Sequence, residues 1–365
     1  MLTAEGKYRP MPVRRTCIEK ATGGLRPLGI PTIQDRVIQH AIQKWIEPRL
    51  DPWFSRFSFG FRIGHNVFGA AQQASQWISA GNEMVIDTDL AKFFDSVPHD
   101  LLMQRISELI GDRVLLRLIK RCLKAGVVER GKFAPTTEGV PQGGPLSPLL
   151  SNIVLHDLDV FLESKGWPFC RYADDVVSFA HSRRTAVRRM KGMREFLQGL
   201  KLKINEQKSG IIPYNRMTYL GYSFHPGRIA ISDKNYEKLK THTVQYLRGS
   251  EVSWERRMTK MFHYHNGWCA HFGQIPDKRQ FRDLDKWFKE DVLCQLPERG
   301  RGLNPRPLAL SSWDATIGKV ACGGRQALQS SRADGGDVND MDDSNCHSDE
   351  DALFEWLKTQ DFTAV

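Results

Sequence analysis

Apolar side chains recur with two different periods along the first 231 residues. From Val37 to Ile46 they repeat every three or four residues after a capping pair, Thr32 and Asp35, which predicts a buried helix that ends at Pro48. The same spacing predicts five more helices. They cover residues 67–80, 101–110, 114–125, 149–162 and 183–200.

Shorter apolar runs, rich in Val, Ile, Tyr and Phe, predict strands between these helices. The runs that flank Asp174 and Asp175 predict a hairpin over residues 169–180, because aspartate is depleted in strands and common in turns. Residues 219–224 and 228–231 predict a second hairpin. After Ser232 the pattern is wholly helical, with amphipathic segments at residues 236–247, 254–272 and 281–293.

Three carboxylates stand where predicted strands end. Asp174 and Asp175 lie in the hairpin turn, and Asp89 ends the strand Glu83–Leu90. Adjacent acids repel each other, so a rigid pair requires cations, and hard oxygen ligands select Mg²⁺ or Mn²⁺. An exposed Asp-Asp turn is the alternative for the pair alone, and the third carboxylate favours a metal site.

Three sequence blocks in this order carry a family resemblance. They are residues 83–99, Gly139-Val-Pro-Gln-Gly-Gly-Pro-Leu-Ser-Pro148, and Phe169-Cys-Arg-Tyr-Ala-Asp-Asp-Val-Val-Ser-Phe-Ala180. They resemble the palm motifs of reverse transcriptases, specifically those of the group II intron type. Further matching motifs extend the resemblance over roughly residues 7–295. They are Tyr8–Pro10, Arg26–Pro31, Ser58–Arg62, Leu202–Ser209 and Tyr219–Tyr222.

The resemblance implies an α+β right-hand polymerase. A fingers-palm portion with an antiparallel palm sheet is expected over residues 1–231, and an all-helical thumb over residues 232–296. An irregular linker (297–331) and an acidic, disordered tail with a short apolar end (332–365) follow from composition. No His and Cys pairs of an endonuclease domain are found after residue 300, and the N-terminal extension usual in the family is short.

The implied activity is RNA-directed DNA synthesis by nucleotidyl transfer. Asp89 and Asp174 would bridge two Mg²⁺ ions, Asp175 would complete the acidic site, and Lys208 would protonate the departing pyrophosphate. A surface lysine is the alternative for Lys208. The resemblance also implies nucleotide-binding residues. They are Lys20, Arg26, Phe94, Gln142, Gly143 and Tyr172.

Some of these nucleotide-binding residues have physical alternatives. Lys20 and Arg26 flank the Gly23-Gly24 turn of a predicted β-hairpin. Their side chains would reach over the triphosphate; the alternative is a solvated basic hairpin. Phe94 lies five residues after Asp89, where its ring would leave no room for the 2′-hydroxyl of an incoming ribonucleotide. The alternative is that the ring fills the hydrophobic core. Because an extended segment alternates its side chains, Phe93 and Phe94 are expected to point in opposite directions.

Charge agrees with a nucleic-acid partner. The chain carries +10 overall, but residues 1–331 hold 50 basic and 32 acidic side chains, or +18. Such a basic body binds polyanions, although ribosomal and membrane-surface proteins share this property. The expected partners are an RNA template, a DNA primer and deoxynucleoside triphosphates, with structured intron RNA as a further candidate.

Cysteine usage and hydropathy indicate a cytoplasmic protein without membrane segments. The seven cysteines form no Cys-x-x-Cys pair, and the N-terminus has no apolar signal region. His265 and Cys269 share a helix face, but two ligands do not make a zinc site.

Arg62 would contact template or nucleotide, or would hold its loop against the palm.

Two other functions fit part of the pattern. A non-catalytic RNA-binding maturase would keep the fold, but decay of activity should have eroded the three acids. An RNA-dependent RNA polymerase would share the palm, but it would usually carry a small or polar residue in place of Phe94.

Overall fold

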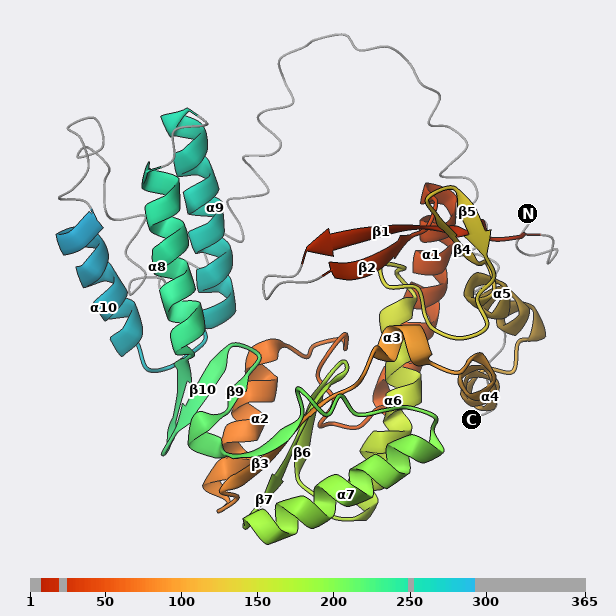
Figure 1. The fold of residues 1–365 in the computed structure, drawn as a ribbon, viewed down its shortest axis with the longest axis horizontal. Helices are drawn as coiled ribbons and strands as arrows, with labels where there is room; N and C mark the ends of the chain where they lie inside the picture. Colours follow the sequence, from red (N-terminus) through yellow and green to blue (C-terminus); the bar gives the residue numbers. More distant parts are fainter. Residues whose placement is uncertain (1–7, 20–24, 249–252, 293–365) are drawn as a thin grey trace. The chain divides into compact units, whose positions relative to one another are not determined.

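The computed structural model describes residues 8–19, 25–248 and 253–292 (Figure 1). These residues form two compact units. The first unit contains residues up to 66 together with 80–212, and the second contains 67–79 together with the described residues from 213 onward. Lys20 and the segments 297–331 and 332–365 lie outside the described residues.

The centre of the first unit is a four-stranded sheet in the order β6-β7-β3-β8, in which β7 pairs antiparallel with both β6 and β3. It contains the predicted hairpin, whose two strands are joined by Ala173 and Asp174. Its strands are β3 (Met84–Asp89), β6 (Phe169–Tyr172), β7 (Asp175–Ala180) and β8 (Gly210–Pro213).

The two faces of this palm sheet differ in chemistry. Ile86 and Val176 lie on one face, where they share a buried core with the helices α6 (Ser147–Ser164) and α7 (Arg183–Gly199). Because side chains alternate along a strand, Asp89 and Asp175 lie on the other face. The helices therefore support the sheet from the side opposite to the acids.

The other helices of the first unit pack into the same core. Thr32 caps α1 (Ile33–Leu50) by accepting a hydrogen bond from the backbone N–H of Asp35, as the sequence predicts. The predicted end at Pro48 is wrong by two residues, because a proline in the last turn loses only its own N–H while Asp51 N–H still reaches the carbonyl of Glu47. The remaining helices are η1 (Asp51–Trp53), α3 (Phe93–Ser96), α4 (His99–Leu109) and α5 (Arg113–Leu123).

A second sheet of the first unit has the order β2-β1-β4-β5. The hairpin of β1 (Val13–Glu19) and β2 (Leu25–Ile30) is the one that the sequence predicts, with Arg26 in β2. The strands β4 (Val127–Glu129) and β5 (Lys132–Ala134) have no counterpart in the prediction, because three residues are too few to show alternation.

The second unit combines small strands with the three predicted C-terminal helices. The predicted hairpin of residues 219–224 with 228–231 is present, but its first strand begins only at Tyr222. Leu220 and Gly221 both adopt positive φ and turn the chain into a further tight hairpin before it. The strands are β9 (Thr218–Tyr219), β10 (Tyr222–His225) and β11 (Arg228–Ile231). The helices are α2 (Val67–Ser79), η2 (Tyr214–Arg216), α8 (Asp233–Arg248), α9 (Trp254–Phe272), α10 (Arg279–Trp287) and the π-helical η3 (Phe288–Val292).

The helices α8 and α9 lie side by side (Figure 1), and together with η3 they form a small core of Leu247, Met258, Met261, Phe288 and Val292. Among the described residues, no helix has the length and apolar character needed to cross a bilayer.

Candidate active site

The predicted carboxylates come together at one end of the palm sheet. Asp89, the last residue of β3, pairs directly with Asp175, the first residue of β7, so both carboxylates lie on the same face. Asp174 precedes Asp175 in the turn. A fourth acid, Asp87, lies two residues before Asp89 and therefore on the same face, and period-two spacing along the predicted strand is the signal that could have identified it.

Burial, together with the crowding of negative charge, raises the pKa of two of these acids. The pKa of Asp175 rises from 3.8 to about 7, first through burial and then through the charges of Asp87, Asp174 and Asp89. The pKa of Asp87 is raised by burial and by Asp89. A neighbouring cation would relieve this repulsion.

The segment after α7 fixes the end of β3. Its Asn205 N–H donates to the carbonyl of Asp89 at 2.8 Å, and the N–H of Asp89 donates to Ser209 Oγ at 2.9 Å. Lys208 Nζ lies 3.1 Å from Asp89 Oδ2, with its side chain 64% exposed. Lys208 is thus beside the acids, and its role as general acid stays a prediction.

Phe94 lies on α3, a single helical turn, and so the predicted extended segment is wrong. Adjacent residues on a helix diverge by about 100° rather than 180°, and the two rings meet edge to face with centroids 5.4 Å apart. Phe93 is buried and Phe94 is half-buried, so only Phe94 keeps an accessible edge. The carbonyl of Phe94 accepts a hydrogen bond from Val140 N–H at 2.6 Å.

The Pro-Gln-Gly loop, residues 141–143, lies against β2. Gln142 accepts a hydrogen bond at its backbone carbonyl from Gly29 N–H at 2.7 Å. Gly143 has φ +114°, and a Cβ there would come within 3.1 Å of the Gly29 carbonyl oxygen, so glycine is required. Through Val140 this loop also contacts Phe94, so the structure brings the predicted residues Phe94, Gln142 and Gly143 onto connected elements.

Tyr172 pairs with Asp175 across the hairpin and lies on the acid-bearing face. Its ring is half-buried, 6.4 Å from the exposed ring of Phe61. Tyr172 is therefore the predicted nucleotide-binding residue nearest in register to the acids.

Arg62 holds its own loop. All five of its N–H donors are used: they bind Asp51 through both carboxylate oxygens and its carbonyl, and the carbonyls of Ser55 and Ser58. Its side chain is 4% exposed. Of the two interpretations that the sequence left open for Arg62, the structural one agrees with these contacts.

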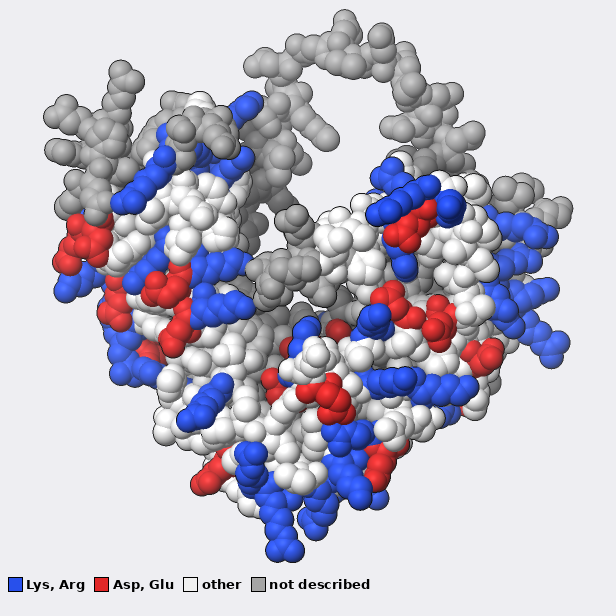
Figure 2. Space-filling model, in the orientation of Figure 1, with Lys and Arg blue, Asp and Glu red and all other residues white. Residues whose placement is uncertain are grey.

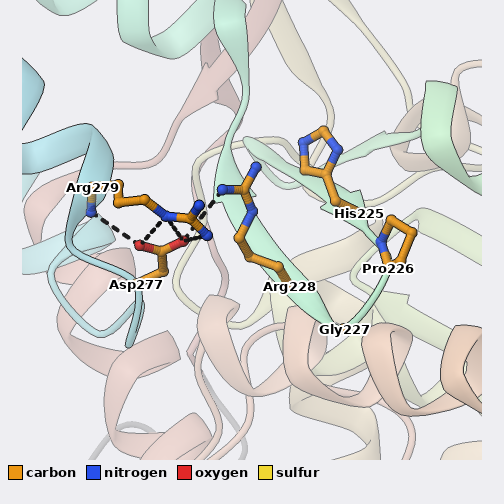
Figure 3. Close-up of a pocket in the computed structure, with 6 residues that line it drawn as sticks. All are labelled: His225, Pro226, Gly227, Arg228, Asp277 and Arg279. Atoms are coloured by element: carbon orange, nitrogen blue, oxygen red, sulfur yellow. Dashed lines mark hydrogen bonds and ion pairs between the residues drawn. The ribbon is translucent and has the colours of Figure 1, made fainter.

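The second unit contains an open groove beside the β10–β11 turn (Figure 3). Arg228 and Arg279 both bind Asp277, with N–O distances of 3.3 and 2.7 Å, and the pKa of Asp277 is held well below its usual range, mainly by hydrogen bonds from Arg279. In the same unit, His265 Nε2 pairs with Thr243 Oγ1 at 2.7 Å, and Cys269 is a buried thiol.

The acids of the palm sheet have the donor chemistry for a hard divalent ion. Carboxylate oxygens from Asp89, Asp174 and Asp175 are the ligands that Mg²⁺ and Mn²⁺ prefer. Across the described ranges, no three His, Cys, Asp or Glu side chains are already arranged to hold a metal ion. Asp89 instead contacts Lys208 and Asn205.

Comparison with known proteins identifies the class. A family model described as reverse transcriptase (RNA-dependent DNA polymerase) matches residues 18–224, more than half of the chain, so the protein belongs to the reverse transcriptase family. Within that family its relatives include proteins of the group II intron type.

Three relatives show how far the similarity extends. Protein YkfC of Escherichia coli strain K12 is 34% identical over 56% of this chain and 64% of its own length. The group II intron-encoded protein LtrA of Lactococcus lactis is 39% identical over 48% of this chain and 29% of its own length. The retron Ec86 reverse transcriptase of E. coli is 24% identical over 77% of this chain and 80% of its own. The chain thus spans less than two thirds of YkfC and LtrA.

Proposed function

We propose that the protein copies an RNA template into DNA by extending a primer with deoxynucleoside triphosphates. The observation that carries the proposal is the register of the palm sheet, which sets Asp89 opposite Asp175 with Asp174 in the adjoining turn. Family membership supports the same reaction.

Asp89, Asp174 and Asp175 would hold the divalent ions. Bound there, a pair of Mg²⁺ ions would activate the primer 3′-hydroxyl and stabilise the charge of the triphosphate and the departing pyrophosphate. Lys208, whose Nζ lies 3.1 Å from Asp89 Oδ2, would donate a proton to the departing pyrophosphate. Phe94 and the loop 141–143 would line the nucleotide, with the ring against the sugar and the amide of Gln142 offering donors and an acceptor.

Primer extension with single acid substitutions tests the proposal. We expect Asp89→Asn and Asp174→Asn to abolish synthesis with Mg²⁺ while RNA affinity is kept, because each change removes a metal ligand and only one negative charge. Asp100→Asn, an exposed acid in the first turn of α4, is the matched control and should extend normally. Extension at the wild-type rate by both active-site variants would refute the site assignment.

The same assay separates two other functions. A non-catalytic RNA-binding maturase would bind RNA and extend no primer, and an RNA-dependent RNA polymerase would use ribonucleotides efficiently. The relatives named as intron-encoded favour intron RNA as a natural partner. Intron RNA folds in the DNA that flanks the gene would support that role.

A further inference from the structure

A buried ion pair lies directly behind the acid-bearing turn. Arg171 immediately precedes Tyr172-Ala173-Asp174 in the chain, and its side chain lies on the sheet face opposite to the acids, toward α6. The side chains of Arg171 and its partner Asp159 are both fully buried. A buried charge pair is costly to desolvate, so its presence requires a reason other than simple stabilisation.

The contacts of Arg171 supply that reason. Its Nε and Nη2 donate to the two carboxylate oxygens of Asp159 at 2.7 and 2.5 Å. Its Nη1 donates to Asn152 Oδ1 at 2.8 Å and to the carbonyl of Ala173 at 3.1 Å. That carbonyl belongs to the peptide bond that continues into Asp174.

Ala173 has an unusual backbone. Its φ of +58° lies in the left-handed region, which costs an alanine about 1 kcal/mol or more, so surrounding contacts must maintain it. The hydrogen bond from Arg171 is one such contact. The orientation of the Asp174 peptide is therefore linked to the buried pair.

A second set of contacts, made by Asn152 and the loop at Gly60, holds the same turn in place. The Asn152 Nδ2 donates to the carbonyl of Gly60 at 2.9 Å. A Cβ at Gly60 would lie 2.3 Å from the backbone nitrogen of Ala173, so the loop backbone packs directly on the turn. The N–H of Phe59 also donates to the carbonyl of Arg171 at 2.8 Å.

We propose that Arg171, Asp159 and Asn152 form a positioning network that holds Asp174 and Asp175 in the geometry needed to bind divalent metal. The inference rests on the proposed polymerase function for its catalytic consequence. Its metal-binding consequence can be measured separately.

A double substitution separates positioning from stability. Replacing both charges, as in Arg171→Met with Asp159→Leu, leaves no unpaired buried charge and is often tolerated by the fold, but removes the hydrogen bond to Ala173. The matched control is Arg105→Met with Asp157→Leu. It removes a partly exposed ion pair with a 2.9 Å contact, also anchored on α6, that does not touch the turn, together with the contact of Arg105 to Glu108.

Two readouts are required. Electron paramagnetic resonance measures free Mn²⁺ and so gives the Mn²⁺ affinity. We expect the affinity of the Arg171/Asp159 variant to be roughly 10- to 100-fold weaker, which is the usual effect of removing residues that support metal ligands. Primer extension should show kcat lowered about 10²-fold, as expected for misplacement near 1 Å, with a smaller change in KM for the nucleotide. The control should keep wild-type values in both assays.

Wild-type Mn²⁺ affinity and kcat in a folded Arg171/Asp159 variant would overturn the inference. If that variant does not fold, Asn152→Ala serves instead: a several-fold loss of Mn²⁺ affinity supports the network, and an unchanged affinity refutes it. Its control is Ser151→Ala, the buried neighbour whose hydroxyl donates to the carbonyl of Ser147. If the wild type binds Mn²⁺ but extends no primer, the proposed function fails. The Mn²⁺ affinities of wild type and variant still show whether the network positions the acids.

Discussion

At the residue scale, the proposed role of Phe94 is to exclude ribonucleotides through the size of its ring. The ring is half-buried against Phe93, and its backbone is fixed by the hydrogen bond to Val140. We expect Phe94→Ala to admit ribonucleotides, because excluding a small group is typically worth ~1–3 kcal/mol, or roughly 10- to 200-fold. Primer extension with each nucleotide set measures it, and Phe133→Ala, an exposed ring on β5, is the control. Unchanged sugar preference in folded Phe94→Ala would remove the steric role.

Sequence reasoning predicted the positions of the three acids at strand ends but missed the residues that support them. Asp89, Asp174 and Asp175 could be predicted because strand and turn propensities place them at strand ends. Arg171 could not, because the partner that allows a charge inside an apolar strand, Asp159, lies on a helix twelve residues earlier. Its position among apolar residues of a predicted strand was the available signal.

At the scale of elements, the pairing of β3 with β7 has a consequence for stability. The folded-state pKa of Asp175 is about 7 against 3.8 normally, so the folded protein binds this proton more tightly than the unfolded chain does. The resulting stability is present below about pH 4 and is lost as pH rises from about 4 to 7.

We therefore expect Asp175→Asn to raise the melting temperature at pH 8 in EDTA by about 2–4 °C or more, and to have little effect at pH 4. Added Mg²⁺ should reduce the difference by stabilising the charged wild-type carboxylate. Melting curves of both proteins across this pH range measure the effect, with Asp100→Asn as the control. A wild type as stable as the variant at pH 8 would contradict the combined effect of burial and neighbouring charge on Asp175.

Elements with strong local signals were predicted well. The 169–180 hairpin, the capped start of α1 and the three C-terminal helices follow from turn propensity, capping and helical period. The turn at Leu220-Gly221 was not predictable, because it breaks an apolar run without a strong signal in the sequence. The pairing of β1 with β4 was not predictable either, because it joins strands more than 100 residues apart.

At the scale of the whole molecule, positive charge is concentrated in residues 1–331, which carry +18. Figure 2 shows Lys and Arg side chains gathered over α7 and beside α5 in the first unit. On α7, Arg183, Arg184 and Arg188 are exposed and take part in no ion pair with the described residues. Such unpaired cations are available to phosphate groups.

RNA affinity should therefore fall steeply with salt, because each phosphate contact releases bound counterions. With six or more contacts, the loss between 50 and 200 mM salt would be about 10³-fold. Replacing Arg183, Arg184 and Arg188 by Gln should lower the slope of log affinity against log salt by ~0.7–0.9 for each of them that contacts phosphate. A second triple variant, with the same change in charge, tests the basic cluster beside α5 separately. It replaces the exposed residues Arg113, Arg117 and Lys120. Fluorescence anisotropy with a labelled RNA hairpin gives both slopes, and a flat wild-type response would contradict binding through the basic body.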